Sequence, residues 1–516
     1  MNKEHYDAII IGAGPGGLSA GLSLASHGWK VLIAEKNGQP GGNCTAKNYS
    51  GYTFDLAVHQ LSGISGKGFS GAILADYGID KMIDFRRVSP FMVICMPDKS
   101  YTICSEKDAF RAELIKNFPD DAADINLCTS KFDSLRKDAL IAERLLYGNS
   151  PVMKRMIAGE ITLKKLLTFP FTALFGIIFK MNSTADEMLR QWVKNPKLRS
   201  VIHSSWSYLG LPPKKLSGLM MSMFLPMQYS EGSYYPKGGS QKIADAMSST
   251  FRERGGEILL NSPVERVLVK GKRAHGVELS DGRKFYADTI ITNAAIPHTY
   301  TRLLEPGAVS AGFMRRLEKM TLSLAPFKVY LGLDYNVAEH GMKHHEYMIF
   351  PGYDHEASYR SMLRGEAEGL SVNSPSTISP ELAPPGHSTL IISTIMPWKP
   401  EQDWRLKKDE IVEKMIALVE KKMLPGLSKH IKVKKVLTPE DLQNLTNSSE
   451  GAMCGWDNTP SQTLTRRLSM RSPLRGLYHV GQWTSPGTGV TSAIISGWLL
   501  GKKLNSWVGK VLYKII

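Results

Sequence analysis

The fold class can be inferred from residues 5–36, which read HYDAIIIGAGPGGLSAGLSLASHGWKVLIAEK. Asp7–Ile11 is a short β-branched run, which predicts a buried parallel strand. A small-residue helix follows, and a second strand, Lys30–Ala34, leads to the acidic residue Glu35. Between the first strand and the helix stand three glycines in the pattern G-x-G-x-x-G: Gly12, Gly14 and Gly17. This order of elements predicts a dinucleotide-binding βαβ unit.

Each part of this unit has a physical role. Gly12 permits the tight turn, Gly14 lets the backbone approach a pyrophosphate, and Gly17 lets the helix pack close to the strand. The helix start offers free N–H groups and a positive dipole end to phosphate. Glu35 can accept hydrogen bonds from the ribose hydroxyls of an adenosine. The candidate cofactor-binding residues of this stretch are Gly12, Ala13, Gly14, Pro15, Gly16, Gly17, Glu35 and Lys36.

A second literal G-x-G-x-x-G lies at residues 66–71, GKGFSG. No strand of adequate length precedes it, and no second strand ending in an acid follows at the right distance. We therefore expect a loop here, which shows how little the bare pattern specifies.

A glycine doublet soon after the first unit distinguishes the cofactor. Gly41 and Gly42 suit a loop that passes over the second phosphate and the ribityl part of a flavin dinucleotide, and Asn43 adds a polar contact. An ordinary glycine turn is the alternative. We predict FAD rather than NAD as the cofactor. The sequence has no second credible dinucleotide motif, so we expect no built-in NAD(P)H-reductase domain.

Composition limits the class of protein. The 516 residues include 64 Lys and Arg against 48 Asp and Glu, a surplus of 16 positive charges. The length predicts more than one lobe, and the surplus predicts an anionic partner, with a lipid surface favoured because no nucleic-acid-binding motif accompanies it. The five scattered cysteines argue against a disulfide framework and a zinc site, and fit a reducing compartment. The first strand leaves no room for a signal peptide.

Several segments, in order, resemble one enzyme family. They are the Gly12–Glu35 fingerprint, the Gly41–Gly42 doublet, GYTFDLAVHQL (51–61), YYPKGGSQKIADAM (234–247) and GQWTSPGTGV (481–490). Together they are similar to the phytoene desaturase, carotene isomerase and retinol saturase family of FAD enzymes, within the wider amine-oxidase-like flavoproteins. The resemblance covers about the first 65 residues, residues 234–297, and residues 451–501.

The resemblance implies an α/β fold with a discontinuous glutathione-reductase-type FAD-binding Rossmann domain. Three blocks, 1–75, 234–300 and 451–505, would form that domain. Residues 76–233 and 301–450 would form a mixed α+β substrate domain, the first part also membrane-associating, and 506–516 a basic amphipathic tail. Within the second block we expect a helix after Gly239, strands at Glu257–Leu260 and Val264–Lys270, a hairpin from Gly276–Leu279 and Lys284–Tyr286, and a further strand at Asp288–Asn293. The family pattern assigns Val264 a backbone contact with adenine and adds Asn293 to the site.

The last block contains a second glycine junction, Gly481–Gly497. Leu477–Val480 predicts a strand that delivers Gly481 to the flavin, and a helix from about Val490 to Leu500 would aim its N-terminus at the ring. A helix dipole there stabilises the negative charge that develops when flavin accepts hydride. The candidate residues are Gly481, Gln482, Gly489, Val490 and Thr491.

Two residues depart from the desaturase pattern. Gln482 stands where carotene desaturases commonly have an acidic or small residue, and Asn43 replaces a frequent arginine. Both favour the saturase or isomerase branch.

Two segments predict a peripheral position on the cytoplasmic side of a membrane. KKLLTFPFTALFGIIFK (164–180) has too short an apolar run to span a bilayer, so it is either an interfacial anchor or a buried helix. GKKLNSWVGKVLYKII (501–516) reads as a basic amphipathic helix.

The leading hypothesis is an FAD-dependent oxidoreductase that passes hydride between flavin N5 and a long polyene or isoprenoid, as saturase, desaturase or isomerase. The alternatives are a flavin amine oxidase and a non-catalytic prenyl-lipid carrier of the escort-protein type. Electrons would pass to or from a quinone, oxygen or a separate reductase. His59 is the candidate for proton transfer, with a structural histidine as the alternative. We expect no metal, because the histidines and Glu346 of residues 340–355 lack a compact ligand spacing.

Overall fold

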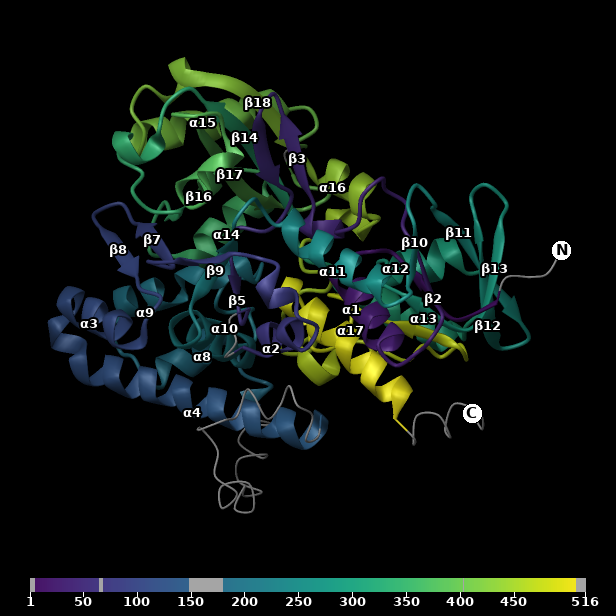
Figure 1. Cartoon of the computed structure of the whole chain (residues 1–516). Helices are drawn as coiled ribbons and strands as arrows, with labels where there is room; N and C mark the ends of the chain where they lie inside the picture. Colours follow the sequence, from purple (N-terminus) through teal and green to yellow (C-terminus); the bar gives the residue numbers. More distant parts are fainter. Residues whose placement is uncertain (1–4, 65–67, 148–179, 402, 507–516) are drawn as a thin grey trace.

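The computed structural model describes residues 5–64, 68–147, 180–401 and 403–506 (Figure 1). Two seven-stranded sheets organise these residues, one at the right of the view and one at the top, and a helical lobe lies below the second.

The first sheet has the order β10-β2-β1-β13-β12-β11, and β19 pairs with the end of β13. The pairs β10–β2, β2–β1, β1–β13 and β13–β19 are parallel, whereas β11, β12 and β13 form an antiparallel meander. The strands are β1 His5–Ile11, β2 Val31–Ala34, β10 Glu257–Leu259, β11 Val264–Lys270, β12 Arg273–Leu279, β13 Lys284–Thr292 and β19 Leu477–His479. Strands from all three sequence blocks of the expected nucleotide domain therefore lie in this one sheet.

Two sequence expectations were wrong in this part of the chain. The strands expected at 284–286 and 288–293 are a single strand, β13, because its first half pairs with β12 while its second half pairs with β19. The second glycine pattern was expected to be a loop, but Gly68 caps helix α2, Phe69–Asp76, and Gly71 lies inside it. Gly66 lies outside the described residues.

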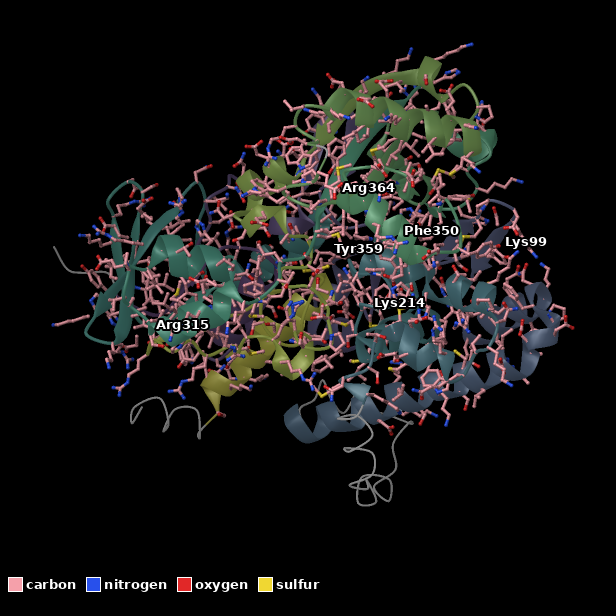
Figure 2. The ribbon with its side chains drawn as sticks, turned by 180° about the vertical axis from the view of Figure 1, so that it is seen from behind. Lys99, Lys214, Arg315, Phe350, Tyr359 and Arg364 are labelled. Carbon is pink, nitrogen blue, oxygen red and sulfur yellow. The ribbon has the colours of Figure 1, made fainter. Side chains whose placement is uncertain are left out.

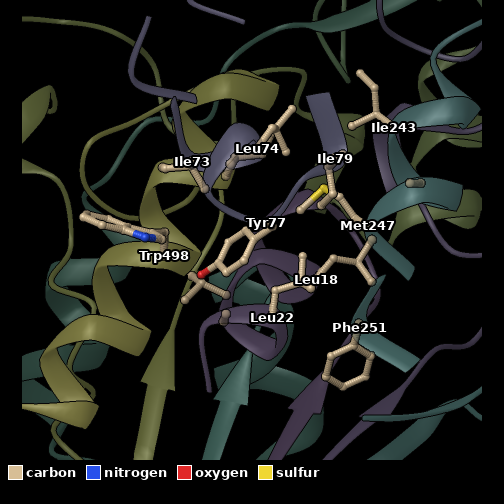
Figure 3. Packing of buried hydrophobic residues seen from close by; sticks show 14 of the residues in the cluster. Leu18, Leu22, Ile73, Leu74, Tyr77, Ile79, Ile243, Met247, Phe251 and Trp498 are labelled. Atoms are coloured by element: carbon tan, nitrogen blue, oxygen red, sulfur yellow. The ribbon is translucent and has the colours of Figure 1, made fainter. Parts of the chain in front are cut away.

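Four helices pack beside this sheet: α1 Pro15–Ala25, α2, α11 Gln241–Glu253 and α17 Val490–Asn505. Figure 3 shows their shared core, which includes Leu18 and Leu22 of α1, Met247 of α11, Tyr77 after α2 and Trp498 of α17. Small residues let α1 and α17 approach closely, since a Cβ atom on Gly497 would lie 2.1 Å from the carbonyl oxygen of Gly16. This contact brings the two glycine junctions of the sequence together.

The second sheet has the order β18-β14-β17-β16-β15-β7-β8. Its central strands β14 and β17 are buried along their whole length, and helix α15 packs its apolar side on them. The strands are β7 Met92–Cys95, β8 Ser100–Ile103, β14 Ala325–Leu333, β15 Glu346–Ile349, β16 Leu370–Asn373, β17 Ser388–Met396 and β18 Ile431–Leu437. The helices near this sheet are α14 His355–Leu363, α15 Lys408–Lys422 and α16 Pro439–Thr446.

The remaining elements form a helical lobe and several smaller groups of strands and helices. Helices α3, α4, α8, α9 and α10 share a separate apolar core with β7 and β8. Their bounds are α3 Lys107–Asn117, α4 Ala122–Tyr147, α8 Ala185–Arg190, α9 Pro196–His203 and α10 Gly218–Ser230. The other elements are α12 Ile296–His298, α13 Ala311–Glu318, a ribbon of β3 Ala46–Tyr49 and β4 Tyr52–Asp55, and a small sheet of β5 Leu61–Ser62, β9 Ser233–Pro236 and β6 Phe85–Val88.

The expected membrane segments are largely outside the structure. Residues 164–179 and 507–516 do not belong to the described residues. Across the parts of the chain that the structure does describe, no helix has the length and apolar character needed to cross a bilayer.

Candidate FAD and substrate site

A cavity of about 360 Å³ lies where the two sheets meet. Its wall on one side comes from the first sheet and the two glycine junctions, and on the other from β14 to β17. Phe350, which follows β15 and lines the cavity, lies between Arg315 and Lys99 in Figure 2, closer to Lys99. Residues from both ends of the chain therefore enclose one space.

The glycines of the first junction shape one end of this cavity. Gly12 has a φ of 94°, a left-handed conformation that favours glycine. Helix α1 begins after Gly14 with no side chain capping it, so its first N–H groups are open to an anion. A Cβ atom on Gly16 would lie 2.8 Å from both N and Cα of Gly481. The two junctions thus touch through their backbones, and Gly16 itself has no room for a side chain.

Glu35 is buried in the wall beside this helix start. Its Oε2 accepts a hydrogen bond from Ala13 N at 2.7 Å, and its Oε1 accepts two from Asn37, both at 2.9 Å. An ionised carboxylate offers about four acceptor positions, so Oε2 keeps one for a ribose hydroxyl. Glu35 therefore both shapes the turn and can bind an adenosine.

Lys36 lines the same cavity, and its amine already donates two hydrogen bonds. Nζ donates to the carbonyl of Asn444 at 2.6 Å and to Oδ1 of Asn447 at 2.7 Å. Burial lowers the pKa of Lys36. The side chain thus holds the loop after α16 beside the site, and the ammonium keeps a third N–H donor for a ligand.

The remaining predicted residues fall into two groups. Along the cavity wall lie Gly12, Gly14, Pro15, Gly16, Glu35, Lys36, Gly42, Asn43, Val264, Asn293, Gly481, Gln482, Gly489 and Val490, together with His59. Just outside it lie Ala13, Gly17, Gly41 and Thr491, which hold the wall in place. A Cβ atom on Gly17, for example, would lie 2.1 Å from the Gly12 carbonyl oxygen, which makes Gly17 a helix-packing residue.

These residues fit an FAD molecule. The paired junctions leave a bare backbone cradle for a pyrophosphate, and Glu35 is placed for a ribose. Oδ1 of Asn43 is buried without a hydrogen-bond partner among the described residues, which suits a residue that meets a polar ligand. FAD bound here would supply hydride transfer at its isoalloxazine ring.

The far side of the cavity combines an apolar wall with one polar cluster. The apolar side chains are Met348, Phe350, Met362, Leu370 and Ile395. Among them Lys328 Nζ lies 3.2 Å from His59 Nε2, and His59 Nδ1 lies 3.1 Å from Glu346 Oε1. Ser371 Oγ donates to the same carboxylate oxygen at 2.7 Å.

Sequence reasoning found His59 but missed Lys328 and Glu346 as site residues. Neither belongs to a recognisable motif. A signal was present, however, because Lys328 is the single charged residue of a strand, APFKVYLGL, whose nine residues are all buried. A buried lysine is rare unless it is paired or functional.

Comparison with known proteins agrees with this geometry. The family model "Flavin containing amine oxidoreductase" matches residues 15–499. The chain belongs to this flavoprotein family. It is 28% identical over 515 residues to a 4,4'-diapophytoene desaturase from a Methylomonas species, covering 97% of this chain and 96% of that protein. It is also 28% identical to prolycopene isomerase 2 from an Oncidium hybrid, over 98% of this chain and 85% of that one.

Solved structures show the same fold. Cyclohexylamine oxidase from Brevibacterium oxydans has a TM-score of 0.57 at 16% identity, covering 98% of this chain and 99% of that one. The protein is thus an FAD-dependent oxidoreductase with the amine oxidase fold.

Charges in the polar cluster of this flavoprotein depend on burial. Burial lowers the pKa of Lys328 to about 8, although Asp55 and Glu346 oppose the shift. Burial raises the pKa of Glu346, but the charge and hydrogen bonds of His59, His345 and Ser371 outweigh it, so the pKa lies below its ordinary value. Glu346 is therefore ionised, and Lys328 changes charge near physiological pH.

His345 of the histidine-rich segment and Cys454 are both buried. Among the described residues, no group of three or more His, Cys, Asp and Glu side chains could hold a metal ion. His345 contacts the His59 carbonyl oxygen at 2.7 Å through Nε2. The cavity-lining Cys454 is buried, and burial raises the pKa of its thiol, which disfavours the reactive thiolate.

Proposed function

We propose that this flavoprotein transfers hydride between FAD and a carbon of a long polyene or isoprenoid lipid. The carrying observation is a group of apolar side chains that lines the same cavity as the dinucleotide-binding residues: Met348, Phe350, Met362, Leu370 and Ile395. A long hydrocarbon matches such a wall, since burying it gains roughly 25 cal/mol per Å². The desaturase and isomerase names of the relatives support the same substrate class.

The protein's own part is to align the substrate and to exclude water. Met348, Phe350 and Leu370 offer apolar contacts to the chain of the lipid. The N-terminus of α17 meets the cavity at Gly489 and Val490, and its dipole favours the negative charge that forms on a reduced flavin. Gln482 lies in the wall, and its carbonyl oxygen accepts a hydrogen bond from Arg467 at 3.3 Å, which fixes its backbone.

An anaerobic experiment with the flavin-loaded protein and candidate polyenes would determine the direction of the reaction. Bleaching of oxidised flavin indicates desaturation, re-oxidation of pre-reduced flavin indicates saturation, and new isomers with unchanged flavin indicate isomerisation. Because of Gln482 and Asn43, we expect saturation or isomerisation.

The same experiment distinguishes the alternatives. Hydrogen peroxide release with amines, and no response to any polyene, would replace the proposal by amine oxidation. A purified protein that binds a prenyl lipid and takes up no flavin would indicate a carrier. Both outcomes contradict a polyene oxidoreductase.

We also propose that the protein binds peripherally to the cytoplasmic face of a membrane and exchanges electrons there with a quinone, oxygen or a reductase. The surplus of 16 positive charges and the lysine-rich segment 501–516 support this. Co-sedimentation with vesicles of 30% anionic lipid should exceed that with neutral vesicles and should fall at high salt. Equal binding to both vesicle types would overturn the electrostatic part of the proposal.

A further inference from the structure

The cluster of Lys328, His59 and Glu346 holds charged groups where a hydrocarbon substrate would lie. Lys328 is 3% exposed and Glu346 is 0% exposed, and Lys328 and His59 both line the cavity. Within the described part of the chain, no carboxylate lies within 4.0 Å of the lysine amine. A buried ammonium without a contacting carboxylate is costly, so the cluster calls for a role beyond stability.

Hydrogen-bond directions define where protons can sit. An ionised Glu346 only accepts hydrogen bonds, so His59 Nδ1 carries a hydrogen toward it. His59 Nε2 then accepts a hydrogen bond from Lys328, whose amine keeps N–H donors whether it is charged or neutral. The 3.2 Å contact between Nζ and Nε2 fixes the position of the amine in the cavity.

We propose that Lys328, positioned by this hydrogen bond to His59, is the acid–base group of the cavity. This rests on the proposed function, because adding or removing a C=C bond moves a proton as well as a hydride. In desaturation one C–H bond breaks and its electron pair leaves as hydride to oxidised FAD. The C–H bond on the adjacent carbon breaks, its proton passes to neutral Lys328, and its electron pair forms the C=C bond. Saturation is the reverse, with Lys328 returning the proton.

The surrounding elements leave Lys328 as the group that titrates in the relevant range. Asp55 of β4 and Glu346 of β15 face it as negative charges. Burial, together with the Glu346 charge, raises the pKa of Tyr208 well above 10. Burial and the nearby Asp55 do the same for Tyr235, which donates to Asp55. Burial lowers the pKa of His345, so none of these groups loses a proton near pH 8.

The protonation of Lys328 can be tested without substrate. Cyanate carbamylates neutral amines, and peptide mass spectrometry of the FAD-loaded protein would follow Lys328 from pH 6 to 11, with the exposed Lys99 as an internal reference. We expect half-maximal reactivity of Lys328 at about pH 8 and a shifted midpoint in His59→Gln and Glu346→Gln. A midpoint near the ordinary lysine value of 10.5 would overturn the acid–base role of Lys328, and a midpoint that both variants leave unchanged would overturn its coupling to His59 and Glu346.

The catalytic role requires single-turnover flavin reduction by the polyene. In the wild type the rate should rise with pH around 8 if the protein desaturates, and fall around 8 in flavin re-oxidation if it saturates. Lys328→Met should slow the step ~100-fold or more. Lys328→Arg, which keeps a charge that does not titrate, should lose the pH dependence. Lys99→Met is the matched control for removal of a lysine.

The outcomes separate this inference from the proposed function. If no polyene changes the wild-type flavin spectrum, the proposed function fails. If polyenes react with the wild type and Lys328→Met reacts at the same rate with the same pH profile, only the acid–base role of Lys328 fails. Thermal unfolding of each variant in the FAD-loaded state shows whether a lost rate reflects lost folding, and Lys328→Arg then carries the test.

Discussion

Gly16 and Gly481 are in direct backbone contact although they lie near opposite ends of the chain. A Cβ atom on Gly16 would fall 2.8 Å from N and Cα of Gly481 and 2.6 Å from Oδ1 of Asn293. Asn293, at the end of β13, therefore packs against both glycine junctions. The pyrophosphate cradle is a three-part wall whose members come from three separate parts of the sequence.

Gly16→Ala should therefore weaken FAD binding by about tenfold or more. Overpacking of this kind costs roughly 1–3 kcal/mol, and 1.4 kcal/mol corresponds to a factor of ten. Flavin absorbance per protein and a flavin-fluorescence titration of the apoprotein measure the effect. Gly352→Ala is the matched control, since nothing lies within 4 Å of its added Cβ atom. Full FAD retention in Gly16→Ala would show that the junctions can separate without cost.

Glu35→Gln should lower FAD affinity by roughly 10- to 100-fold. The carboxylate accepts hydrogen bonds from Ala13 and Asn37, and an amide in its place removes one acceptor oxygen and the negative charge. Hydrogen bonds to charged groups contribute about 1.5–3 kcal/mol. The same titration measures the loss, and Glu339→Gln, at an exposed position, is the control. An unchanged affinity would mean that Glu35 only shapes the turn.

Local patterns predicted the elements around the cofactor, because strand, turn and helix signals are short-range. The pattern of glycines identified both junctions, and Gly16 and Gly481 proved to be neighbours. The sequence could not show that Asn293 fills the space between them, since such contacts arise only when distant strands pair in one sheet. The same limit hid Glu346, which reaches His59 from a strand of the other sheet.

The secondary structure predicted from the sequence was wrong where tertiary contacts override a local sequence signal. Residues 284–292 contain two strand-like runs, which are one strand because β1 pairs across their join while β12 and β19 pair with the two halves. Gly71 lies in a helix because Phe69 packs edge-on against Trp498 and Ile73 is buried in the same core, and this burial outweighs the low helix propensity of glycine.

His203→Met should stabilise the protein by roughly 1–3 kcal/mol at pH 7. His203 is buried, and both of its ring nitrogens lack a hydrogen-bond partner among the described residues, a state that costs about this much per group. Burial lowers the pKa of His203 to about 3. The unfolded chain therefore takes up a proton below pH 6.5 that the folded chain does not, so stability is lost as pH falls from 6.5 toward 3.

Denaturant unfolding between pH 4 and 8 measures this effect. The variant should lose less stability than the wild type on the acid side. His203→Gln is the matched control, because it also removes the titration but keeps a polar group, and should flatten the acid side without the gain at pH 7. Identical pH dependence in all three proteins would contradict the assignment.

Asp457→Asn should stabilise the protein at pH 8 and leave it unchanged at pH 4. Burial raises the pKa of Asp457 from 3.8 to about 7, against the charges of Lys215 and Arg467. The folded chain therefore binds more protons than the unfolded chain between pH 3.8 and 7, and stability falls as pH rises through that window. The shift corresponds to roughly 4 kcal/mol at pH 8. Arg467, beside Asp457, donates to the carbonyl oxygens of Trp456 and Gln482, so the flavin content of the variant must be measured with its unfolding curve. An equal stability gain at pH 4 and pH 8 would contradict the raised pKa of Asp457, because it would mean that the folded chain already ionises this carboxylate at pH 4. The charge of the buried Arg467 would then keep the carboxylate ionised.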